Sequence, residues 1–460
     1  MKYVIALFII MASFVVIGCA AEPKSGRLSG ALVQSNTTSR GALSDRSLRQ
    51  FDAPHLTDES TLADYLAFAA LNNPGLKERF LGYIAAVEQV PEAGALPDPQ
   101  LSYGYFIREV ETRVGPQQHR LGIMQRFPWF GTLEARSDAA SQRAKAAGQR
   151  FEAAKLELFR QVTDAYAEYV YLGSSIEIAA ANVELLEHFE QVALIQYEAG
   201  RASFADVVRA QLELAVLEDT LRGLQELRPA RAGRLNAILG RDPAKDLPWP
   251  APVEPVMEPL ETESVIAALR ERNPDLEALR HQIEAAEHEV TLAQKRSLPD
   301  FSVGVDWIQT GSARMADVPN SGKDPVILMF SMNLPLWQDS YAAGRRQARA
   351  QAAGQRRGRQ EAENRLISQA QDSLYEYNDS RRKLRLYNEV LLPRAEQLLE
   401  ASETGYQAAM VDFIGLIDAQ RLLLQYELQY IRAAADNIQA VAAIERLAGQ
   451  NMSTLMDNPN

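Results

Sequence analysis

The sequence has 460 residues, of which 47% are hydrophobic and 23% are charged, and its formal net charge is -12. This balance is that of an ordinary folded protein, and the acidic excess argues against a nucleic-acid partner. The single cysteine, Cys19, excludes internal disulfides.

The chain begins with the features of an exported lipoprotein. Lys2 precedes an apolar run from Val4 to Ile17, which is too short to span a bilayer and is typical of a signal peptide. The run ends in Val16-Ile17-Gly18-Cys19, which resembles the bacterial lipobox, so we expect residues 1–18 to be removed and Cys19 to carry lipid, including palmitate. The alternative is an ordinary signal peptide with a chance cysteine.

The residues after Cys19 predict the destination of the chain. Ala20 stands where an aspartate would favour retention in the inner membrane, so we expect delivery to the outer membrane. Residues 19–54 are rich in Ser, Gly, Thr and Arg and lack apolar periodicity, which predicts a lipidated tether rather than a domain.

Two halves of the chain carry the same signals in the same order. The matches are Asn73-Pro74 with Asn273-Pro274, Leu96-Pro97-Asp98 with Leu298-Pro299-Asp300, Phe127-Pro128-Trp129 with Leu334-Pro335-Leu336-Trp337, and 197–212 with 406–421. We therefore predict two repeats, 55–250 and 251–450, followed by a flexible tail at 451–460. Each repeat is expected to open with short helices, as over 62–71 and on to about residue 90.

Alternating residues predict a β-hairpin in each repeat, over 100–127 and 300–335. Leu101, Tyr103 and Tyr105 alternate with small or polar residues, and the second repeat alternates over 301–307 and 326–332. Strands of about eight to ten residues can cross a bilayer when tilted. Four strands cannot close a barrel, so a membrane location requires several chains, and three chains would supply twelve strands. The alternative is a pair of soluble hairpins packed on helices.

A very long helix is predicted after each hairpin, over 133–198 and 341–407, because both stretches are rich in alanine and poor in glycine and proline. At about 1.5 Å per residue each would reach roughly 100 Å, which requires coiled-coil packing. Return helices are predicted over 203–239 and 414–447, so the long helices of the two repeats end at about 240 and 448. Pro393 should kink the second long helix or force a local bulge.

The order of short helices, hairpin, long helix and return helix resembles the TolC-like outer-membrane efflux proteins over most of residues 55–450. The turn motifs make the chain most similar to the outer-membrane components of heavy-metal resistance-nodulation-division exporters. The resemblance implies a mainly α fold with a small β part: a long α-helical coiled-coil barrel plus four transmembrane β-strands per chain. In a trimer these strands would complete a twelve-stranded barrel, and each chain has an internal twofold repeat.

The resemblance also implies roles for residues at the two helical turns. Gly200, Arg201, Ala409 and Met410 lie where the family's helical tips dock a periplasmic adaptor. Asp206 and Tyr406 match the acidic and tyrosine partners of the family's periplasmic latch, and Asp418 matches a residue of its acidic ring. Gly415 and Val411 stand where the family has another acidic residue and an arginine, so this gate is expected to differ. The alternative is that both aspartates are solvated helical carboxylates.

The sequence lacks a catalytic motif or a phosphate-binding loop, and we expect neither enzymatic activity nor a cofactor or metal site. His281 and His288 flank Glu284 on one predicted helix, and a solvated helix face is the favoured interpretation over a metal site. An arginine cluster follows the second hairpin, with headgroups, neighbouring helices or water as candidate partners: Arg345, Arg346, Arg349, Arg356, Arg357 and Arg359.

We therefore predict a passive, gated exit duct in the cell outer membrane that is lipid-anchored and extends into the periplasm. Its expected partners are two further copies of the chain, a periplasmic adaptor of the membrane fusion class, an inner-membrane pump of the resistance-nodulation-division type, and outer-membrane lipid. Heavy-metal cations or drugs are the candidate substrates. The alternative function is a lipid-anchored periplasmic coiled-coil scaffold or adaptor without a transmembrane barrel.

Overall fold

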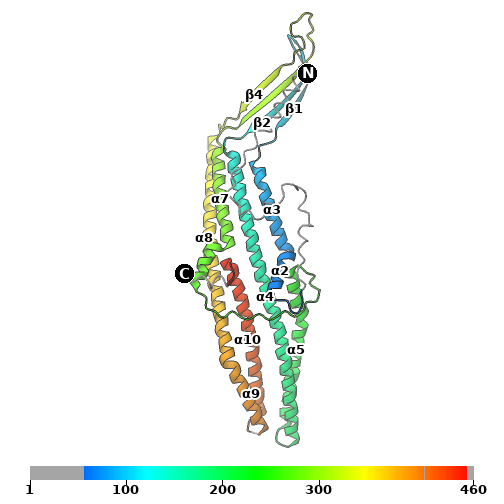
Figure 1. The fold of residues 1–460 in the computed structure, drawn as a ribbon, viewed down its shortest axis with the longest axis vertical. Coiled ribbons are helices and arrows are strands. Elements are labelled where there is room, and N and C mark those ends of the chain that lie inside the picture. Colours follow the sequence, from blue (N-terminus) through cyan, green and yellow to red (C-terminus); the bar gives the residue numbers. More distant parts are fainter. Residues whose placement is uncertain (1–55, 409, 453–460) are drawn as a thin grey trace. The chain divides into compact units, whose positions relative to one another are not determined.

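A computed structural model describes residues 56–408 and 410–452, and its fold is mainly helical with one small sheet. The sheet lies beyond one end of the long helices, and the turns that join the long and return helices lie at the other end (Figure 1). The predicted fold class is thus confirmed for the chain. Cys19, residues 1–18 and the rest of the predicted tether 19–54 lie outside the described residues, as do residues 453–460 of the predicted tail.

Each half of the described chain opens with two short helices. The helices are α2 (Leu62–Asn72), α3 (Pro74–Gly94), α6 (Thr262–Arg272) and α7 (Pro274–Lys295). Asn73 and Asn273 stand between the helices of each pair and cap the second helix through their side-chain oxygens.

The same two asparagines also tie the short helices to the return helices. The side-chain amide of Asn73 donates to the carbonyl of Ile238 at 2.8 Å, and that of Asn273 donates to the carbonyl of Leu447 at 2.9 Å. Both carbonyls lie in the last turn of a helix, where backbone oxygens lack an intrahelical partner. The repeated Asn-Pro pairs therefore form equivalent corners in the two halves.

The sheet has four antiparallel strands in chain order. They are β1 (Gln100–Thr112), β2 (Gly115–Phe127), β3 (Phe301–Thr310) and β4 (Val326–Met332). Both predicted hairpins are present, and the pairing of β2 with β3 joins the two halves. The predicted strand length of eight to ten residues is wrong for β1 and β2, which have 13 each, because pairing continues to the tight turn before Gly115. It is also wrong for β4, which has 7.

The long helices of the first half match their predicted bounds closely. α4 (Thr132–Glu198) has 67 residues, about 100 Å of helix, and α5 (Phe204–Leu239) returns along it. In the second half, α10 (Phe413–Ala448) packs against α4, and so the two halves share one helical layer. The alanines of α4 that are buried, such as Ala139 and Ala193, let neighbouring backbones approach closely.

The second long helix is interrupted, as Pro393 predicts. α8 (Gln338–Leu386) is followed by a π-helix, η2 (Tyr387–Leu391), and then by α9 (Leu392–Gln407). Proline has no amide hydrogen and its ring displaces the carbonyl four residues earlier, so the wider π-turn relieves the clash. The prediction of a kink or bulge is confirmed as a bulge.

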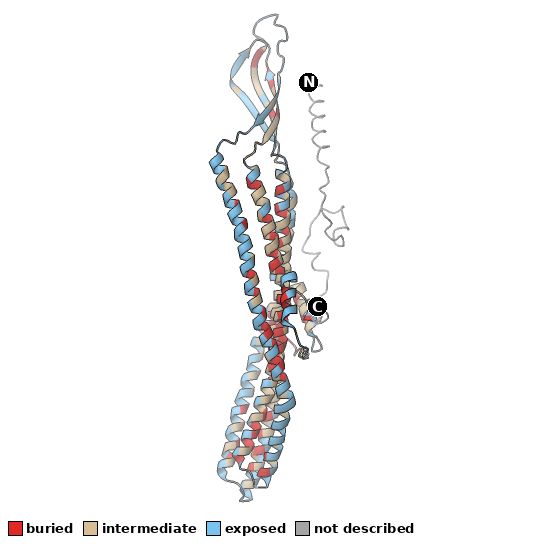
Figure 2. Cartoon of the chain, turned by 90° about the vertical axis from the view of Figure 1, so that its left-hand side faces the viewer, coloured by how far each residue is buried: buried red, intermediate tan, exposed pale blue. Residues whose placement is uncertain are grey.

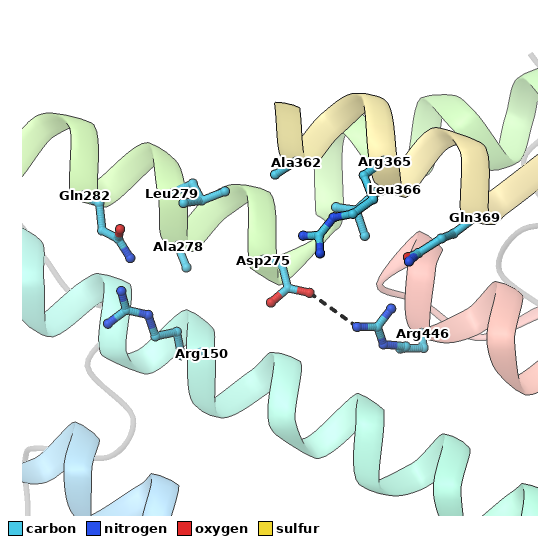
Figure 3. A pocket seen from close by; sticks show the side chains of 10 residues that line it. All are labelled: Arg150, Asp275, Ala278, Leu279, Gln282, Ala362, Arg365, Leu366, Gln369 and Arg446. Carbon is cyan, nitrogen blue, oxygen red and sulfur yellow. Dashed lines mark ion pairs between the residues drawn. The ribbon is translucent and has the colours of Figure 1, made fainter. Parts of the chain in front are cut away.

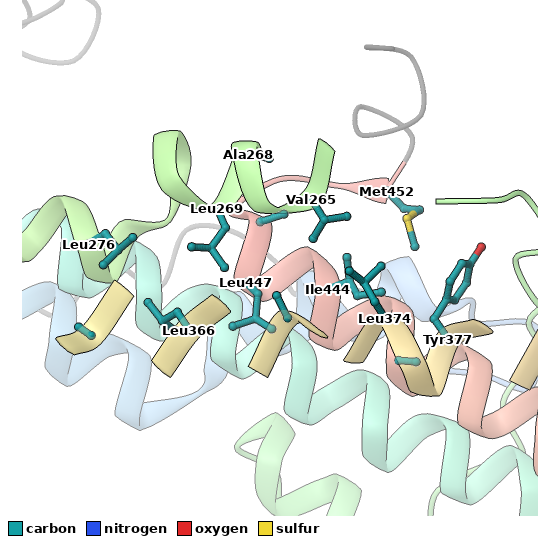
Figure 4. Close-up of a cluster of buried hydrophobic side chains, with 14 residues drawn as sticks. Val265, Ala268, Leu269, Leu276, Leu366, Leu374, Tyr377, Ile444, Leu447 and Met452 are labelled. Carbon is teal, nitrogen blue, oxygen red and sulfur yellow. The ribbon is translucent and has the colours of Figure 1, made fainter. Parts of the chain in front are cut away.

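Two equivalent hydrophobic clusters hold the short helices against the long ones. Leu158, Val162, Tyr166 and Tyr169 of the first cluster correspond to Leu366, Ala370, Leu374 and Tyr377 of the second at one constant spacing along the chain. Figure 4 shows the second cluster, in which side chains of α6, α8 and α10 meet. The duplication therefore extends from sequence motifs to core packing.

Much of each long helix remains exposed in the single chain. Figure 2 shows buried residues along the inner faces of the helices and exposed residues along whole outer faces. Among the described residues, none of the helices carries an apolar stretch long enough to cross a bilayer.

Candidate functional site

The first helical tip contains a glycine in a conformation that other residues avoid. Gly200 follows the end of α4 with φ at 73°, in the left-handed region that favours glycine. The amides of Arg201 and Ala202 both donate to the carbonyl of Gln196, at 2.8 and 3.1 Å. These bonds close the last turn of α4 and leave the predicted tip residues Gly200 and Arg201 exposed on the turn.

Asp206 has a structural role that our sequence analysis missed. Its carboxylate accepts a hydrogen bond from the amide of Ser203 at 3.1 Å, and its own amide donates to the Ser203 hydroxyl at 3.3 Å. This reciprocal pair is a capping box at the start of α5, and the Ser-Phe-Ala-Asp sequence was its signal. The carboxylate also lies 3.9 Å from the guanidinium of Arg209.

The second helical tip is built differently. Met410 is 80% exposed, and its amide donates to the carbonyl of Gly405 at 2.8 Å, whereas Ala409 lies outside the described residues. Val411 packs so closely on Gly405 that a Cβ there would lie 2.6 Å from a Val411 methyl group. Asp412 caps α10 through the amide of Gly415 at 2.9 Å. A Cβ at Gly415 would lie 3.0 Å from a Val411 methyl group, so Val411 and Gly415, which we expected to depart from the family pattern, pack against each other.

The same pair of aromatic side chains occurs at both tips, in two different environments. Tyr197 and Phe204 have ring centroids 5.6 Å apart, and Tyr406 and Phe413 have theirs 5.3 Å apart. Tyr406 and Phe413 are buried in a cluster formed with α4 and α5. Tyr197 and Phe204 are 43% and 61% exposed. The first pair therefore lacks, within the described chain, the cover that the second pair has.

The two predicted latch residues are neighbours but are not hydrogen-bonded to each other in the single chain. The hydroxyl of Tyr406 is buried and has no hydrogen-bond partner within residues 56–408 and 410–452. Burial, together with the negative charge of Asp206, raises the pKa of Tyr406. The latch between them stays a prediction.

Asp418 lies on the surface of α10. Its side chain is 65% exposed, and its carboxylate lies 3.6 Å from the guanidinium of Arg421. Arg421 also pairs with Glu213 of α5. An exposed carboxylate in this position is available to line an opening, and its role in an acidic ring stays a prediction.

A buried polar chain links the halves just above the tips. Gln420 donates to Asn182 at 2.9 Å, and Asn182 donates to the carboxylate of Glu427 at 3.0 Å. Burial raises the pKa of Glu427, although the bond from Asn182 opposes the shift. The sequence offered no signal for this chain, because its members come from helices far apart in sequence.

The two faces of the sheet differ as the alternation predicts. One face exposes a row of large apolar side chains, including Leu101, Tyr103 and Phe330, which are 71%, 66% and 69% exposed. On the other face, Gly122 leaves room for Asp306, which is 1% exposed and pairs with Arg120. Such a sheet suits a boundary between lipid and a polar interior.

The interpretation of the histidine face as solvated is wrong for His281. This side chain is 8% exposed and its Nδ1 lies 2.8 Å from the Gln142 side-chain oxygen, because α7 lays this face on α4. His288 lies 3.9 Å from Asp138. Within the described residues, groups of three or more histidine, cysteine or acidic side chains that could hold a metal ion are absent.

The arginine cluster after the second hairpin is partly paired. Arg356 bonds Glu287 of α7 at 2.6 Å, Arg357 bonds Gln360 at 3.0 Å, and Arg359 lies 3.6 Å from Glu363. Arg345, Arg346 and Arg349 form no ion pair within the part of the chain that the structure describes.

Comparison with known proteins finds similarity over most of the chain. A family model described as "Outer membrane efflux protein" matches residues 67–241 and 265–450. The cobalt-zinc-cadmium resistance protein CzcC of Cupriavidus metallidurans is 22% identical over 400 residues, covering 85% of this chain and 90% of that protein.

Solved structures share the fold at low sequence identity. The structure of CusC has a TM-score of 0.73 at 16% identity, with 88% of this chain and 96% of that chain covered. The outer membrane protein VceC of Vibrio cholerae has a TM-score of 0.70 at 19% identity, with 85% and 96% covered.

Proposed function

The chain belongs to the outer membrane efflux protein family, and from this premise we propose that three copies form the exit duct of a tripartite efflux system. The protein is an outer-membrane channel and not an enzyme. We propose that a periplasmic adaptor and an inner-membrane pump of the resistance-nodulation-division type deliver the cargo. Transport through the duct is then passive, and the pump supplies the energy.

The sheet with its exposed apolar face is the observation that carries the proposal. β1 and β4 are its edge strands, and each has unpaired backbone groups along one side. Such edges are not tolerated in lipid, where each unpaired group costs several kcal/mol. Pairing of β4 with β1 of the next copy removes every edge when the ring closes, and three copies give twelve strands.

The internal repeat supports the same assembly at the tips. Phe413 and Ile417 of α10 are 1% and 2% exposed because they pack on the first tip. Their counterparts on α5 are Phe204 and Val208, which are 61% and 37% exposed. An equivalent contact, in which α9 of a second copy covers α5, would bury both side chains.

Near the sheet, a contact between α4 and α7 within one chain also has a counterpart pair, on α8 and α3, whose two side chains carry opposite charges. Asp138 of α4 lies 3.9 Å from His288 of α7 within one chain. The counterparts at this level are Arg346 of α8 and Glu88 of α3, which carry opposite charges and form no ion pair within the described residues. Packing of α8 against α3 of the next copy would bring these two side chains together.

The tips form the periplasmic end in this proposal. Gly200, Arg201, Ala409 and Met410 are the proposed docking points for the adaptor, and Tyr406 and Asp206 the proposed latch. A carboxylate that accepts a phenol hydrogen bond contributes about 1.5–3 kcal/mol, and less where water enters. The buried Tyr406 hydroxyl, which lacks a partner within the described chain, supports a closing contact of this kind. Asp418 is the proposed acidic lining of the opening.

Two measurements test the duct against the alternative of a lipid-anchored scaffold. Purified protein in a planar bilayer should form discrete, long-lived conducting channels, and the absence of conductance would exclude a duct. The variant Cys19→Ser removes the proposed lipid anchor and should leave the protein in the outer membrane after washing at high pH. Free release of this variant would favour the scaffold.

The proposed substrates are heavy-metal cations or drugs. The relative CzcC is named for resistance to cobalt, zinc and cadmium, which supports metal export. A deletion strain tested against a panel of metals and drugs should gain sensitivity to one class and recover when the chain is restored.

A further inference from the structure

A pocket with three arginines lies in the wall of the helical layer, outside the sites described above. It has a volume of about 470 Å³ and lies where α7 begins and α10 ends, between α4 and α8. Arg150 comes from α4, Arg365 from α8 and Arg446 from α10, and all three line the same pocket (Figure 3).

The positive charge of the pocket exceeds its negative charge. Arg446 lies 3.7 Å from Asp275 and 2.8 Å from Glu157, so it has partners within the chain. Neither Arg150 nor Arg365 forms an ion pair within the described residues, and Asp275 is the acidic residue that lines the pocket. Guanidinium groups that line one pocket without carboxylate partners favour an anionic ligand, because their planar donors match carboxylate and phosphate oxygens.

The pocket also has an apolar wall. Ala278 and Leu279 of α7 and Ala362 and Leu366 of α8 line it beside the arginines. Gln282 and Gln369 also line the pocket, so its surface is mainly polar with one apolar side. A volume of about 470 Å³ has room for more than a simple ion, so the pocket favours an organic molecule whose anionic head meets the arginines and whose short apolar body meets the four apolar side chains.

The arginines are not a requirement of the duplicated fold. At the spacing that relates the two hydrophobic clusters, Arg365 corresponds to Glu157, and Arg150 corresponds to Gly358. The matching position in the other repeat thus has an acidic residue and a glycine where the pocket has two arginines. Both repeats pack in the same way although only one has these arginines. The arginines of the pocket are therefore not needed for helix packing.

The pocket lies next to the cluster that holds α6, because Ala362 and Leu366 belong to both, and Arg365 extends from its far side. Glu363 of α8 bonds Arg270 of α6 at 3.1 Å. Arg365 is two residues further along α8, about 200° around the helix axis, so it points to the opposite side. In the proposed duct α2 and α6 lie outside the wall, because inside they would fill the passage, and the Arg365 side of the pocket then faces the lumen.

We propose that Arg150, Arg365 and Arg446 form a binding site for small organic anions that carry a carboxylate or phosphate head and a short apolar body. The lumenal position of this site rests on the proposed function. Three copies would place nine arginines at one level of the duct. Acidic organic cargo would bind there in transit, whereas a free metal cation would gain nothing from the site.

Calorimetry on the intact, detergent-solubilised protein tests the site, with hexyl phosphate and hexanoate as anionic probes and hexyltrimethylammonium as the cationic control. We expect saturable binding of the two anions alone, weakened by salt. The double variant Arg150→Gln with Arg365→Gln should bind them at least about tenfold more weakly, because each arginine contributes a charge-assisted hydrogen bond. Arg222→Gln, an exposed arginine of α5 outside the pocket, should bind as the unaltered protein does.

Two results would overturn the proposal: no saturable anion binding by the unaltered protein, or equal binding by the double variant. The first needs no variant, so a folding defect cannot obscure it. Channel conductance, measured on the same preparations, separates this proposal from the duct itself. If both proteins conduct and the double variant binds anions as the unaltered protein does, the pocket proposal is wrong and the duct stands. If the unaltered protein does not conduct, the proposed function is wrong.

Discussion

Truncation of Phe204 tests whether the exposed face of the first tip is covered by a second copy. Its counterpart Phe413 is 1% exposed, and removal of a fully buried phenylalanine side chain costs about 3–5 kcal/mol. Phe204 is 61% exposed, so Phe204→Ala should cost an isolated chain only roughly 1–2 kcal/mol. If a neighbouring copy covers Phe204, the cost of its truncation rises by about 2 kcal/mol at each of three contacts, which is the difference between a buried and an exposed phenylalanine. The trimer then loses about 6 kcal/mol, roughly four orders of magnitude in its dissociation constant.

The assay is the dissociation of the purified trimer with rising detergent and temperature, followed by gel mobility and light scattering. Phe204→Ala should dissociate well before the unaltered protein, while helical content by circular dichroism stays the same. Phe204→Leu keeps the apolar contact and serves as the matched control, and Phe413→Ala should lower both trimer stability and chain stability. A Phe204→Ala trimer as resistant as the unaltered one would refute the argument from the internal repeat.

Three further predictions follow from the described contacts. Asn273→Ala removes a helix cap and leaves a buried carbonyl unpaired, so unfolding by denaturant should show a loss of about 2–3 kcal/mol. Burial raises the pKa of Glu445 above 4.5, so the folded chain holds this proton more tightly than the unfolded chain does. Glu445→Gln should therefore raise the melting temperature at pH 7.5, and the gain should shrink as the pH falls through the raised pKa; a gain that is constant with pH would contradict this. In single-channel recordings, Asp206→Ala with Tyr406→Phe should raise the open fraction, whereas Ser203→Ala, which weakens the same helix cap but keeps the carboxylate, should not.

The elements of the fold were predictable because their signals are local. Asn73 and Asn273 precede prolines at helix starts, and the alternation that begins at Leu101 has the period of a strand. The bounds of the strands were less predictable, because β1 and β2 continue through residues whose pairing depends on the partner strand. The bulge at Pro393 followed from the chemistry of proline.

The candidate site was predictable only where it depended on local sequence or on resemblance. The capping role of Asp206 was predictable from its position three residues after Ser203, because this spacing is that of a capping box. The chain from Gln420 through Asn182 to Glu427 could not be predicted, because it depends on which faces of distant helices meet. The burial of His281 has the same cause, since α4 covers one face of α7.

The π-helix bears on how a duplicated chain could have evolved. The spacing between equivalent residues of the two halves grows by one between Tyr377 and Tyr406, across the segment that contains η2. One added residue turns the rest of an α-helix by about 100°, and a π-turn absorbs it without rotating α9 off its partner. Each half supplies two strands, so a single-repeat ancestor would need a ring of six identical units to provide the same twelve strands. The inserted residue is present only in the second half of each chain. It therefore makes the two repeats different, and a ring of six equal units becomes a ring of three pairs in which the two repeats can diverge.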